Sequence, residues 1–502
     1  PTERLRIKSD GKVLVGLGCT DASLLNVKGS AGFADDGTNA GLIISTDDAN
    51  GAALSCLTTG GFVNGAYGNM RLNALSHKFT YGNTVRLLID STGHATFGGD
   101  IAAAQDYPVI KPTLDLNFAA TKTLDPRIEY YRYGPGSYID ENGKVVLVGE
   151  DVPRFDHDPD TGECKGLLVE GERRNYFPNG VRLGDKWTGS KGGSTWTENT
   201  TETTAPDGTY TATKWAFTST DPYLYHQQTL LAGVTYTMSV WVKAGTNMSG
   251  DVLQMRMGAS PYSTNANSTI PTDGSWKRLT FTKTIGGSNE TNVNVGFEPQ
   301  TNPSGNPASG DVIYVWGAQL ESGTTASSFI PTYGYTQARG PDVVQITGEE
   351  FSDFYNQIEG TIFLSASYDT DARAASIVTI DDTSAYANYT EVGYRAGGAS
   401  SGQVSSYSRT TAGNDQYYKN WVNSATQGNE FKIAFAYKDN DYASSGNGET
   451  AHTDNSGTTH KLFDRLKFSE VHTVGHGGVG HYRRLMYYSK RITNSQLKTL
   501  TS

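Results

Sequence analysis

The 502-residue chain carries 41 Lys and Arg against 52 Asp and Glu, a net charge of −11. A mildly acidic chain without a basic patch excludes nucleic-acid binding by phosphate neutralisation, and no apolar run reaches the roughly 18 residues of a membrane span, so no membrane insertion is expected. The 58 Gly and 29 Tyr, with only 6 Met, favour strands and turns and predict an all-β fold.

The first predicted elements are two copies of one β-hairpin. Glu3–Gly16 (ERLRIKSDGKVLVG) recurs as Val85–Gly98 (VRLLIDSTGHATFG), and each copy alternates apolar and polar residues around a turn at Gly11 or Gly93. So short a hairpin cannot bury a core alone. We therefore predict that residues 1–104 form a fibrous, self-associating region.

Two features of the whole chain concern its processing and its thiols. Because the sequence opens with Pro-Thr-Glu and shows no signal-peptide pattern, we expect a processed chain or a piece of a longer one. The odd number and wide spacing of Cys19, Cys56 and Cys164 argue against a disulfide framework. We expect three free thiols made in a reducing compartment.

Residues 105–178 are predicted to be a connecting β segment. Leu114–Phe118 alternates like a strand, and Ser137–Gly149 is predicted as a hairpin that turns at Asn142 and Gly143. The acidic run that follows, FDHDPD, is interpreted as a turn rather than a glycosidase acid pair, because neighbours on a strand point to opposite faces.

Residues 179–340 are predicted to form a jelly-roll sandwich, and residues 341–502 a separate all-β domain. Thr235–Ala244 alternates over ten residues in the first, as Phe431–Lys438 does in the second. The chain is expected to end in a short helix over Asn494–Leu500, capped by Thr493 or Asn494.

Aromatic residues near turns suggest carbohydrate binding. Sugars present apolar C–H faces that stack on aromatic rings and hydroxyls that bond to amides and carboxylates. Trp241 and Trp316 are predicted to be core because they lie in the middle of strands. The predicted carbohydrate-binding residues are Tyr223, Tyr225 and Gln227 in the jelly roll and Tyr394, Trp421 and Tyr442 in the separate all-β domain.

Two groups of residues raise the question of a metal. Asp439 and Asp441 resemble the start of a Ca²⁺ loop, although the EF-hand spacing is missing and a surface turn is the alternative. His472, His476 and His481 lie in a glycine-rich run that favours loop histidines over a ligand set. Apart from Ca²⁺, no cofactor is expected.

Three parts of the chain resemble bacteriophage fibre proteins. The first is a fibre module, with matching segments at Leu114–Ala119, Lys122–Arg127, Val152–Pro159, Gly166–Glu170 and the pair Arg174 and Asn175. The next two resemble a jelly-roll carbohydrate-binding module at Val234–Gly245 and Asp311–Tyr333, and a concanavalin A-like lectin or glucanase sandwich at Lys432–Lys438 and Tyr487–Thr501. Together they resemble tail-fibre or virion-appendage proteins such as those of marine cyanophages.

The resemblance implies a function and a location. It implies a non-enzymatic homotrimeric fibre of the virion, attached to other virion proteins at its N-terminal end and binding a host-surface glycan during adsorption. Two alternatives stay open. One is a tailspike-like depolymerase, which predicts a long parallel β-helix, and the other is a purely structural fibre or decoration protein.

Overall fold

In the computed structural model the chain forms two compact units, Pro1–Ala102 and Ala103–Ser502. In the first unit the structure describes the backbone of six short strands. In the second it describes residues 110–502 except 185–186, 191–193, 219–221, 259–264, 302–304, 370–374, 383–387, 396–402, 411–413, 422–427 and 471–478.

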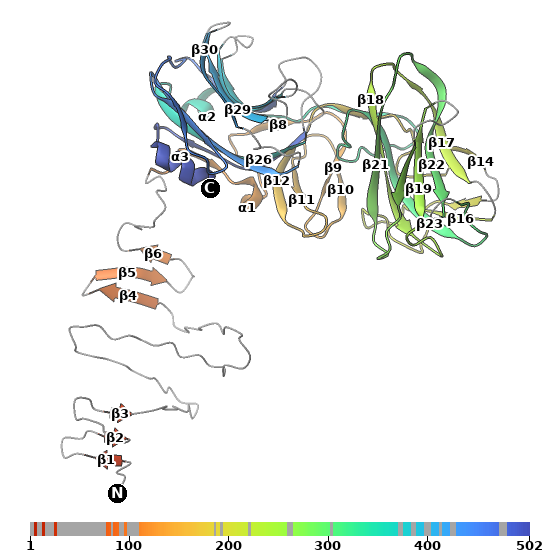
Figure 1. The fold of residues 1–502 in the computed structure, drawn as a ribbon, viewed down its shortest axis with the longest axis horizontal. Helices are drawn as coiled ribbons and strands as arrows, with labels where there is room; N and C mark the ends of the chain where they lie inside the picture. The colour runs from red at the N-terminus through yellow and green to blue at the C-terminus, as the bar shows by residue number, and fades with distance from the viewer. Residues whose placement is uncertain are drawn as a thin grey trace. The chain divides into compact units, whose positions relative to one another are not determined.

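Both copies of the repeated segment in the first unit are hairpins, as predicted. Antiparallel pairing joins Leu5 to Val15 in the first copy and Leu87 to Phe97 in the second, at equivalent places in the repeat. Each hairpin belongs to a three-stranded sheet (Figure 1). The strands are β1 (Leu5–Ile7), β2 (Val13–Val15) and β3 (Leu25–Val27) in one sheet, and β4 (His77–Tyr81), β5 (Thr84–Ile89) and β6 (Ala95–Phe97) in the other.

The second unit contains a jelly-roll-type sandwich of two five-stranded antiparallel sheets, as predicted for residues 179–340. One sheet has the order β14 (Thr188–Ser190), β17 (Tyr223–Leu230), β22 (Glu290–Gln300), β19 (Val252–Met257) and β20 (Asn265–Thr269). The other has the order β15 (Ser194–Thr197), β16 (Thr213–Phe217), β23 (Val312–Ser322), β18 (Thr235–Ala244) and β21 (Lys277–Thr284). Alternate residues such as Leu224 and Met238 meet in the core between the sheets.

The second sandwich packs an eight-stranded sheet on a seven-stranded one, as the period-two strands in the last part of the chain predict. The first comprises β11 (Arg154–His157), β12 (Cys164–Val169), β35 (Val479–Tyr488), β26 (Glu359–Asp369), β31 (Glu430–Lys438), β32 (Tyr442–Gly446) and β33 (His452–Asp454), with β7 (Leu114–Leu116) paired to β35. The other has the order β30 (Asp415–Trp421), β29 (Gln403–Arg409), β28 (Tyr389–Arg395), β27 (Ala375–Asp381), β34 (Arg465–Glu470), β25 (Val343–Thr347) and β8 (Glu129–Tyr131).

Helices are short and few in the described part of the chain. They are α1 (Phe118–Thr121), α2 (Gly348–Ser352) and α3 (Asn494–Thr501). The predicted C-terminal helix is confirmed, and Thr493 caps it in a capping box with Gln496. Leu497 of α3 packs on alanines of β31 and β32, which explains why these strands are apolar on both faces. None of the helices described is long and apolar enough to cross a membrane.

The segment predicted to connect the fibre to the jelly roll belongs instead to the second sandwich. Its strands β7 and β12 both pair with β35, and its strand β8 pairs with β25. The prediction of a separate segment at 105–178 is therefore corrected: the jelly roll is inserted into a sandwich built from both sides of it. Local sequence patterns could not predict this pairing, because the paired strands lie more than 200 residues apart in the chain.

Two two-stranded sheets lie in the segments next to the inserted jelly roll. The chain enters and leaves the jelly roll through β13 (Arg173–Asn175) and β24 (Gln337–Arg339), which pair antiparallel. The predicted hairpin with a turn at Gly143 is confirmed as β9 (Gly136–Ile139) and β10 (Val145–Val148), and Gly143 has the positive φ that the turn needs. Cys164, on β12, is a free thiol as expected; Cys19 and Cys56 lie outside the described residues.

Candidate functional site

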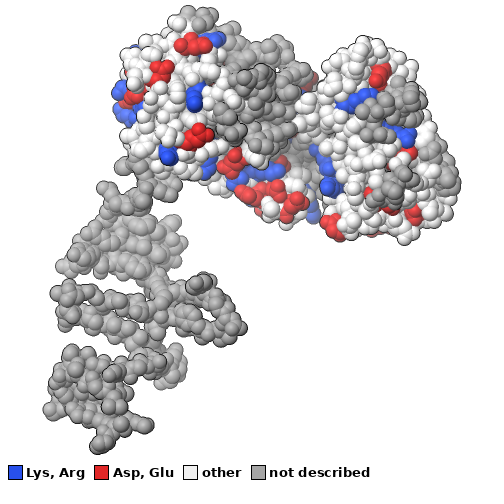
Figure 2. Space-filling model, viewed as in Figure 1, with Lys and Arg blue, Asp and Glu red and all other residues white. Residues whose placement is uncertain are grey.

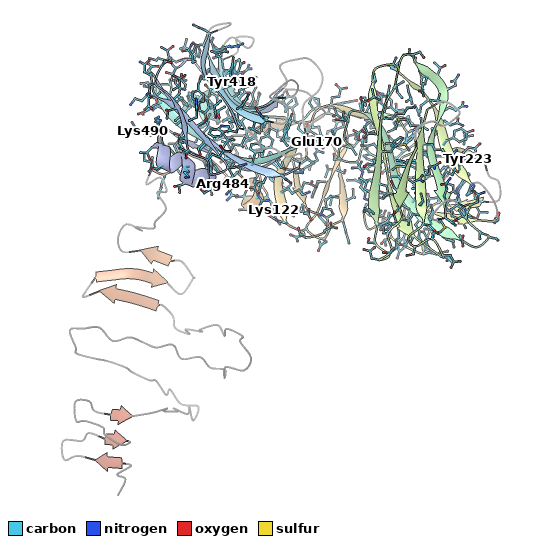
Figure 3. The ribbon with its side chains drawn as sticks, in the orientation of Figure 1. Lys122, Glu170, Tyr223, Tyr418, Arg484 and Lys490 are labelled. Atoms are coloured by element: carbon cyan, nitrogen blue, oxygen red, sulfur yellow. The ribbon has the colours of Figure 1, made fainter. Side chains whose placement is uncertain are left out.

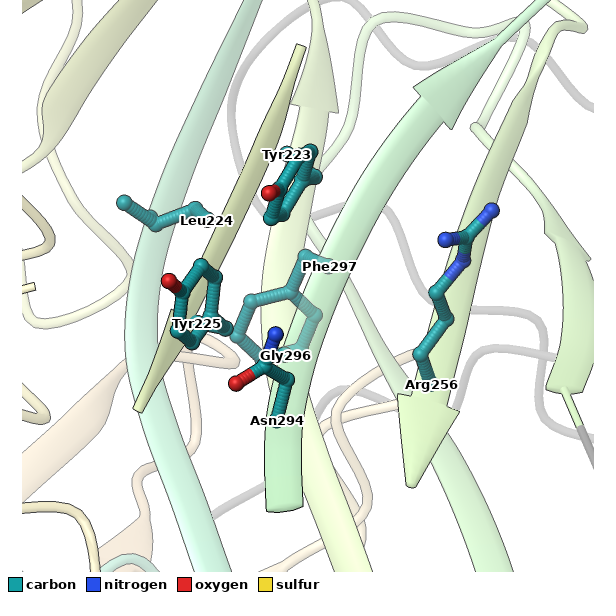
Figure 4. Close-up of a pocket in the computed structure, with 7 residues that line it drawn as sticks. All are labelled: Tyr223, Leu224, Tyr225, Arg256, Asn294, Gly296 and Phe297. Carbon is teal, nitrogen blue, oxygen red and sulfur yellow. The ribbon is translucent and has the colours of Figure 1, made fainter. Parts of the chain in front are cut away.

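Two of the predicted carbohydrate-binding residues form an aromatic pair on the outer face of the jelly roll. Tyr223 and Tyr225 alternate with the core residue Leu224 along β17, so their rings point away from the core together. The ring centroids lie 5.3 Å apart with an angle of 17° between the planes. The pair therefore presents a continuous, half-buried aromatic surface (Figure 4).

A glycine of the neighbouring strand lies next to this pair and brings the two backbones close together. Pairing across three adjacent strands sets Tyr225 opposite Gly296 of β22, and Gly296 opposite Arg256 of β19. A Cβ atom on Gly296 would lie 1.9 Å from the backbone oxygen of Leu224, so no other residue fits without movement of the strand. In Figure 4 the tyrosine rings lie on one side of Gly296 and Arg256 lies on the other, with a shallow pocket between them.

The far side of this pocket carries a row of connected polar groups. Arg256 pairs with Glu298, and its Nε donates to Oε1 of Gln254 at 2.7 Å. Nε2 of Gln254 donates to Oδ1 of Asn267 at 2.9 Å, and Nε2 of Gln300 donates to Oε1 of Glu298 at 3.0 Å. These contacts hold Arg256, the member of this row that lines the pocket, in a fixed position, whereas Gln254 and Glu298 are buried beside it.

The pocket is bounded by amides at its other end. Gln227, the third predicted residue of this group, is exposed and pairs across the sheet with Asn294 of β22. Asn294 lines the pocket, whereas Gln227 lies next to it on the same face. The sheet thus brings all three predicted residues of the jelly roll to one place.

Packing on the opposite face of β17 holds the aromatic pair in place. His226 comes between Tyr225 and Gln227 in the sequence and therefore points to this opposite face. Its ring packs on Trp187, with 4.4 Å between ring centroids, and on Phe177, with 5.9 Å. Burial of this ring lowers the pKa of His226 to about 4, so it is neutral near pH 7. A neutral imidazole among aromatic rings behaves as part of the core.

The structure corrects the prediction for two residues of the second sandwich. Trp421 is 1% exposed and Tyr442 is fully buried, and both belong to the core between the two sheets. The Tyr442 ring packs against Tyr417, with 5.8 Å between centroids. Neither ring offers a face to a sugar, because the register of β30 and β32 turns these side chains inward. Tyr394 lies on β28, but its side chain is outside the described residues.

The predicted calcium residues are engaged within the protein. Oδ1 of Asp439 accepts hydrogen bonds from the backbone N–H and the hydroxyl of Thr459 at 2.7 and 2.9 Å, and Oδ2 lies 3.1 Å from Nζ of Lys461. Asp441 pairs with Arg491 at 2.9 Å. No group of three metal-ligating side chains was found among the described residues, and calcium binding stays a prediction.

One residue of the predicted acidic turn contacts one residue of the glycine-rich histidine segment in the second sandwich. His481 Nε2 lies 2.8 Å from a carboxylate oxygen of Asp156, which comes from the predicted acidic turn. Asp156 itself lies on β11, so the first half of that run is a strand rather than a turn. His472 and His476 lie outside the described residues.

Besides core residues, the pocket contains three residues that the sequence did not predict, namely Arg256, Asn294 and Gly296. Alternation predicts which face of its own strand each residue occupies, and Val293–Phe297 is a strand as expected. It does not predict which strands are neighbours, and only the order β17-β22-β19 brings these residues to the tyrosine pair. An isolated glycine in a strand was the one available signal.

Comparison with known proteins gives structural matches alone, since no family model and no curated protein matches the chain. A CBM40 domain of a Ruminococcus gnavus sialidase bound to α2,3-sialyllactose is 16% identical over 29% of this chain and 84% of its own length, with a TM-score of 0.25. NanB with Optactamide is 15% identical over 31% of this chain and 26% of that one, with a TM-score of 0.26. The binding domain of botulinum neurotoxin serotype D is 12% identical over 31% and 39%, with a TM-score of 0.23. At these scores the matches carry no argument about what this chain binds.

Proposed function

We propose that the protein binds carbohydrate through the outer face of the β14-β17-β22-β19-β20 sheet. The observation that carries this proposal is the stacked pair Tyr223 and Tyr225 beside Gly296, with Arg256 on the other side. A pyranose ring has one apolar C–H face and several hydroxyl groups. It therefore suits a pocket that has an aromatic surface on one wall and hydrogen-bonding groups on the other.

The pocket itself encloses only about 10 Å³, so a saccharide would lie across the outer face of the sheet and not enter the pocket. Neighbouring strands lie about 4.8 Å apart, so Tyr225 and Arg256 are separated by about 10 Å across Gly296. Hydroxyls that reach this far meet a guanidinium and the amide of Asn294. Because Arg256 is already paired with the buried Glu298, the site does not require a charged sugar, and the Asn294 amide supplies both a donor and an acceptor.

The test is glycan-array screening of the intact chain, followed by calorimetric titration of the best ligand. Tyr225→Ala removes half of the aromatic surface, and we expect about a tenfold loss of affinity. Tyr210→Ala is the matched control, because Tyr210 is an exposed tyrosine of the same domain that does not line the pocket. Equal affinities for the two variants would refute this site.

We further propose that the chain is a homotrimeric virion fibre that attaches phage to host-surface glycans and does not cut them. The repeated three-stranded sheets support this, since each is too small to bury a core and gains partners in a trimer. Light scattering should give three times the chain mass of 54.1 kDa. A monomer would exclude the trimeric fibre.

The depolymerase alternative has its own test. The sheets of the described residues are antiparallel except for the pairing of β2 with β3, which gives no support to a parallel β-helix. We expect no new reducing ends when the protein is incubated with polysaccharides that it binds. Release of reducing ends would favour the depolymerase.

A further inference from the structure

A second cavity, of about 160 Å³, lies where the jelly roll meets the other sandwich. A single buried water needs about 10–15 Å³ on this measure, so the cavity has room for a small organic molecule. Both sandwiches and the β9-β10 hairpin contribute to the wall. The residues that matter most are Tyr138, Asp156, Trp241, Arg278 and His481.

This junction is rich in buried ion pairs, and nearly every charge in it has a direct partner. The carboxylate of Glu170, which is labelled in Figure 3, pairs with Arg154 and Arg339. The further pairs are Arg132 and Arg154 with Asp342, Arg173 with Glu321, and His481 with Asp156. These pairs neutralise charges that would otherwise be costly to bury.

Arg278 is the exception among these arginines. It lies on the face of Trp241, with 4.5 Å from the guanidinium carbon to the ring centroid. Its Nε and Nη2 donate to the Ser239 hydroxyl at 3.2 and 3.0 Å, and its Nη1 donates to the Ser327 carbonyl at 2.7 Å. A guanidinium has five N–H donors, so two stay without a protein acceptor among the described residues. All three contacts are to neutral groups.

The net charge of the junction also favours the binding of an anion near Arg278. Five arginines and four carboxylates take part, so one positive charge is in excess before His481, the partner of Asp156, is counted. Burial lowers the pKa of Arg278 to about 10, so the group is still charged at pH 7. A partly buried cation with free donors attracts an anion, and a carboxylate matches the fork of a guanidinium.

The remaining wall of the cavity is suited to hydroxyl groups. Oδ1 of Asp156 accepts a hydrogen bond from the backbone N–H of Ile139 at 2.6 Å, and Oδ2 lies 2.8 Å from Nε2 of His481, so each oxygen can accept one further hydrogen bond. The Tyr138 hydroxyl has no hydrogen-bond partner within the described part of the chain. We propose that the cavity binds a small polyhydroxy carboxylate of the uronic-acid type, with its carboxylate on Arg278 and its hydroxyls toward Asp156 and Tyr138. This site is separate from the outer face of the jelly roll.

The first experiment uses the unmodified full chain. Calorimetric titration with glucuronate and with glucose compares two sugars that differ in the carboxylate. We expect glucuronate to bind at least about tenfold more tightly, as a charge-assisted pair of hydrogen bonds provides. Equal affinities, or no binding of glucuronate, would overturn the proposal. An oligosaccharide that ends in a uronic acid then shows whether the ligand is free or part of a glycan.

Variants separate this site from the proposed glycan face. Arg278→Gln should lower glucuronate affinity about tenfold or more, and Tyr138→Phe should lower it a few-fold, whereas Tyr225→Ala should leave it unchanged. The comparison of the two sugars on the unmodified chain stands even if Arg278→Gln folds poorly. An unchanged affinity in a folded Arg278→Gln variant, or a loss in Tyr225→Ala, would contradict the assignment.

Discussion

The two sandwiches of this protein are built in different ways from the same kind of strand. The jelly roll folds from one continuous stretch of chain, between β13 and β24. The other sandwich needs β7, β8, β11 and β12 from before this stretch and all its later strands from after it. Local sequence patterns therefore predict the first domain better than the second.

The two sandwiches also differ in where they place the residues predicted to bind carbohydrate. In the jelly roll, Tyr223 and Tyr225 lie on an outward face, and a glycine of the neighbouring strand lies next to them. In the second sandwich, Trp421 and Tyr442 point into the core. Figure 2 shows Lys and Arg close to Asp and Glu on this side of the second unit, with no patch of a single sign dominating it. Strand register, rather than composition or charge, decides which aromatic residues can meet a ligand.

The largest effect is expected where the inserted domain joins its host. Glu170 is 1% exposed and compensates two buried arginines, Arg154 and Arg339. Glu170→Gln removes this charge, and we expect a loss of about 3–5 kcal/mol in the free energy of unfolding. Glu163→Gln is the control, because its partner Arg483 lies at the surface and such pairs contribute about 0–1 kcal/mol. Urea denaturation measures both; a similar small loss in each would show that the junction does not bind the sandwiches together.

A smaller effect should be confined to the second sandwich. Trp421→Phe leaves unfilled space in the core, and we expect a loss of about 1–3 kcal/mol. Calorimetry should show a lower melting temperature for this sandwich alone, with glycan binding by the jelly roll unchanged. Leu462→Ala provides the reference, since Leu462 is 74% exposed in the same sandwich. If Trp421→Phe weakened glycan binding without a change in stability, its placement in the core would have to be revised.

These contrasts show how far sequence could go. The repeated hairpins, the hairpin at Gly143 and the helix capped by Thr493 were predictable because turns, caps and alternation are local. The pairing of β7 with β35 joins residues about 370 positions apart, as with Leu116 and Leu485, and no local pattern encodes it. Of the pocket, only the tyrosine pair could be predicted, because Tyr223 and Tyr225 lie on one strand. Gly296 and Arg256 lie beside them because of the order of the strands, which local sequence does not encode.

The smallest effect tests the jelly roll through pH. The pKa of His226 is about 4 in the folded protein, against 6.5 for the unperturbed side chain, because the ring is desolvated. Between these values the unfolded chain takes up a proton that the folded domain does not, so stability falls as the pH drops from 6.5 to 4 and is unaffected above 6.5. We expect a loss of about 1–2 kcal/mol, reduced by the partial exposure of the ring.

His226→Gln should remove most of this slope from the jelly-roll transition and leave the transition of the second sandwich unchanged. Because the folded His226, between Tyr225 and Gln227 on β17, stays neutral down to about pH 4, the glycan affinity of the folded unmodified chain should stay constant over this range and fall only below about pH 4. Thermal unfolding followed at half-unit steps of pH measures both variants. The same slope in His226→Gln would mean that another group titrates, and the packing of this ring would then not be what holds the tyrosine pair in place.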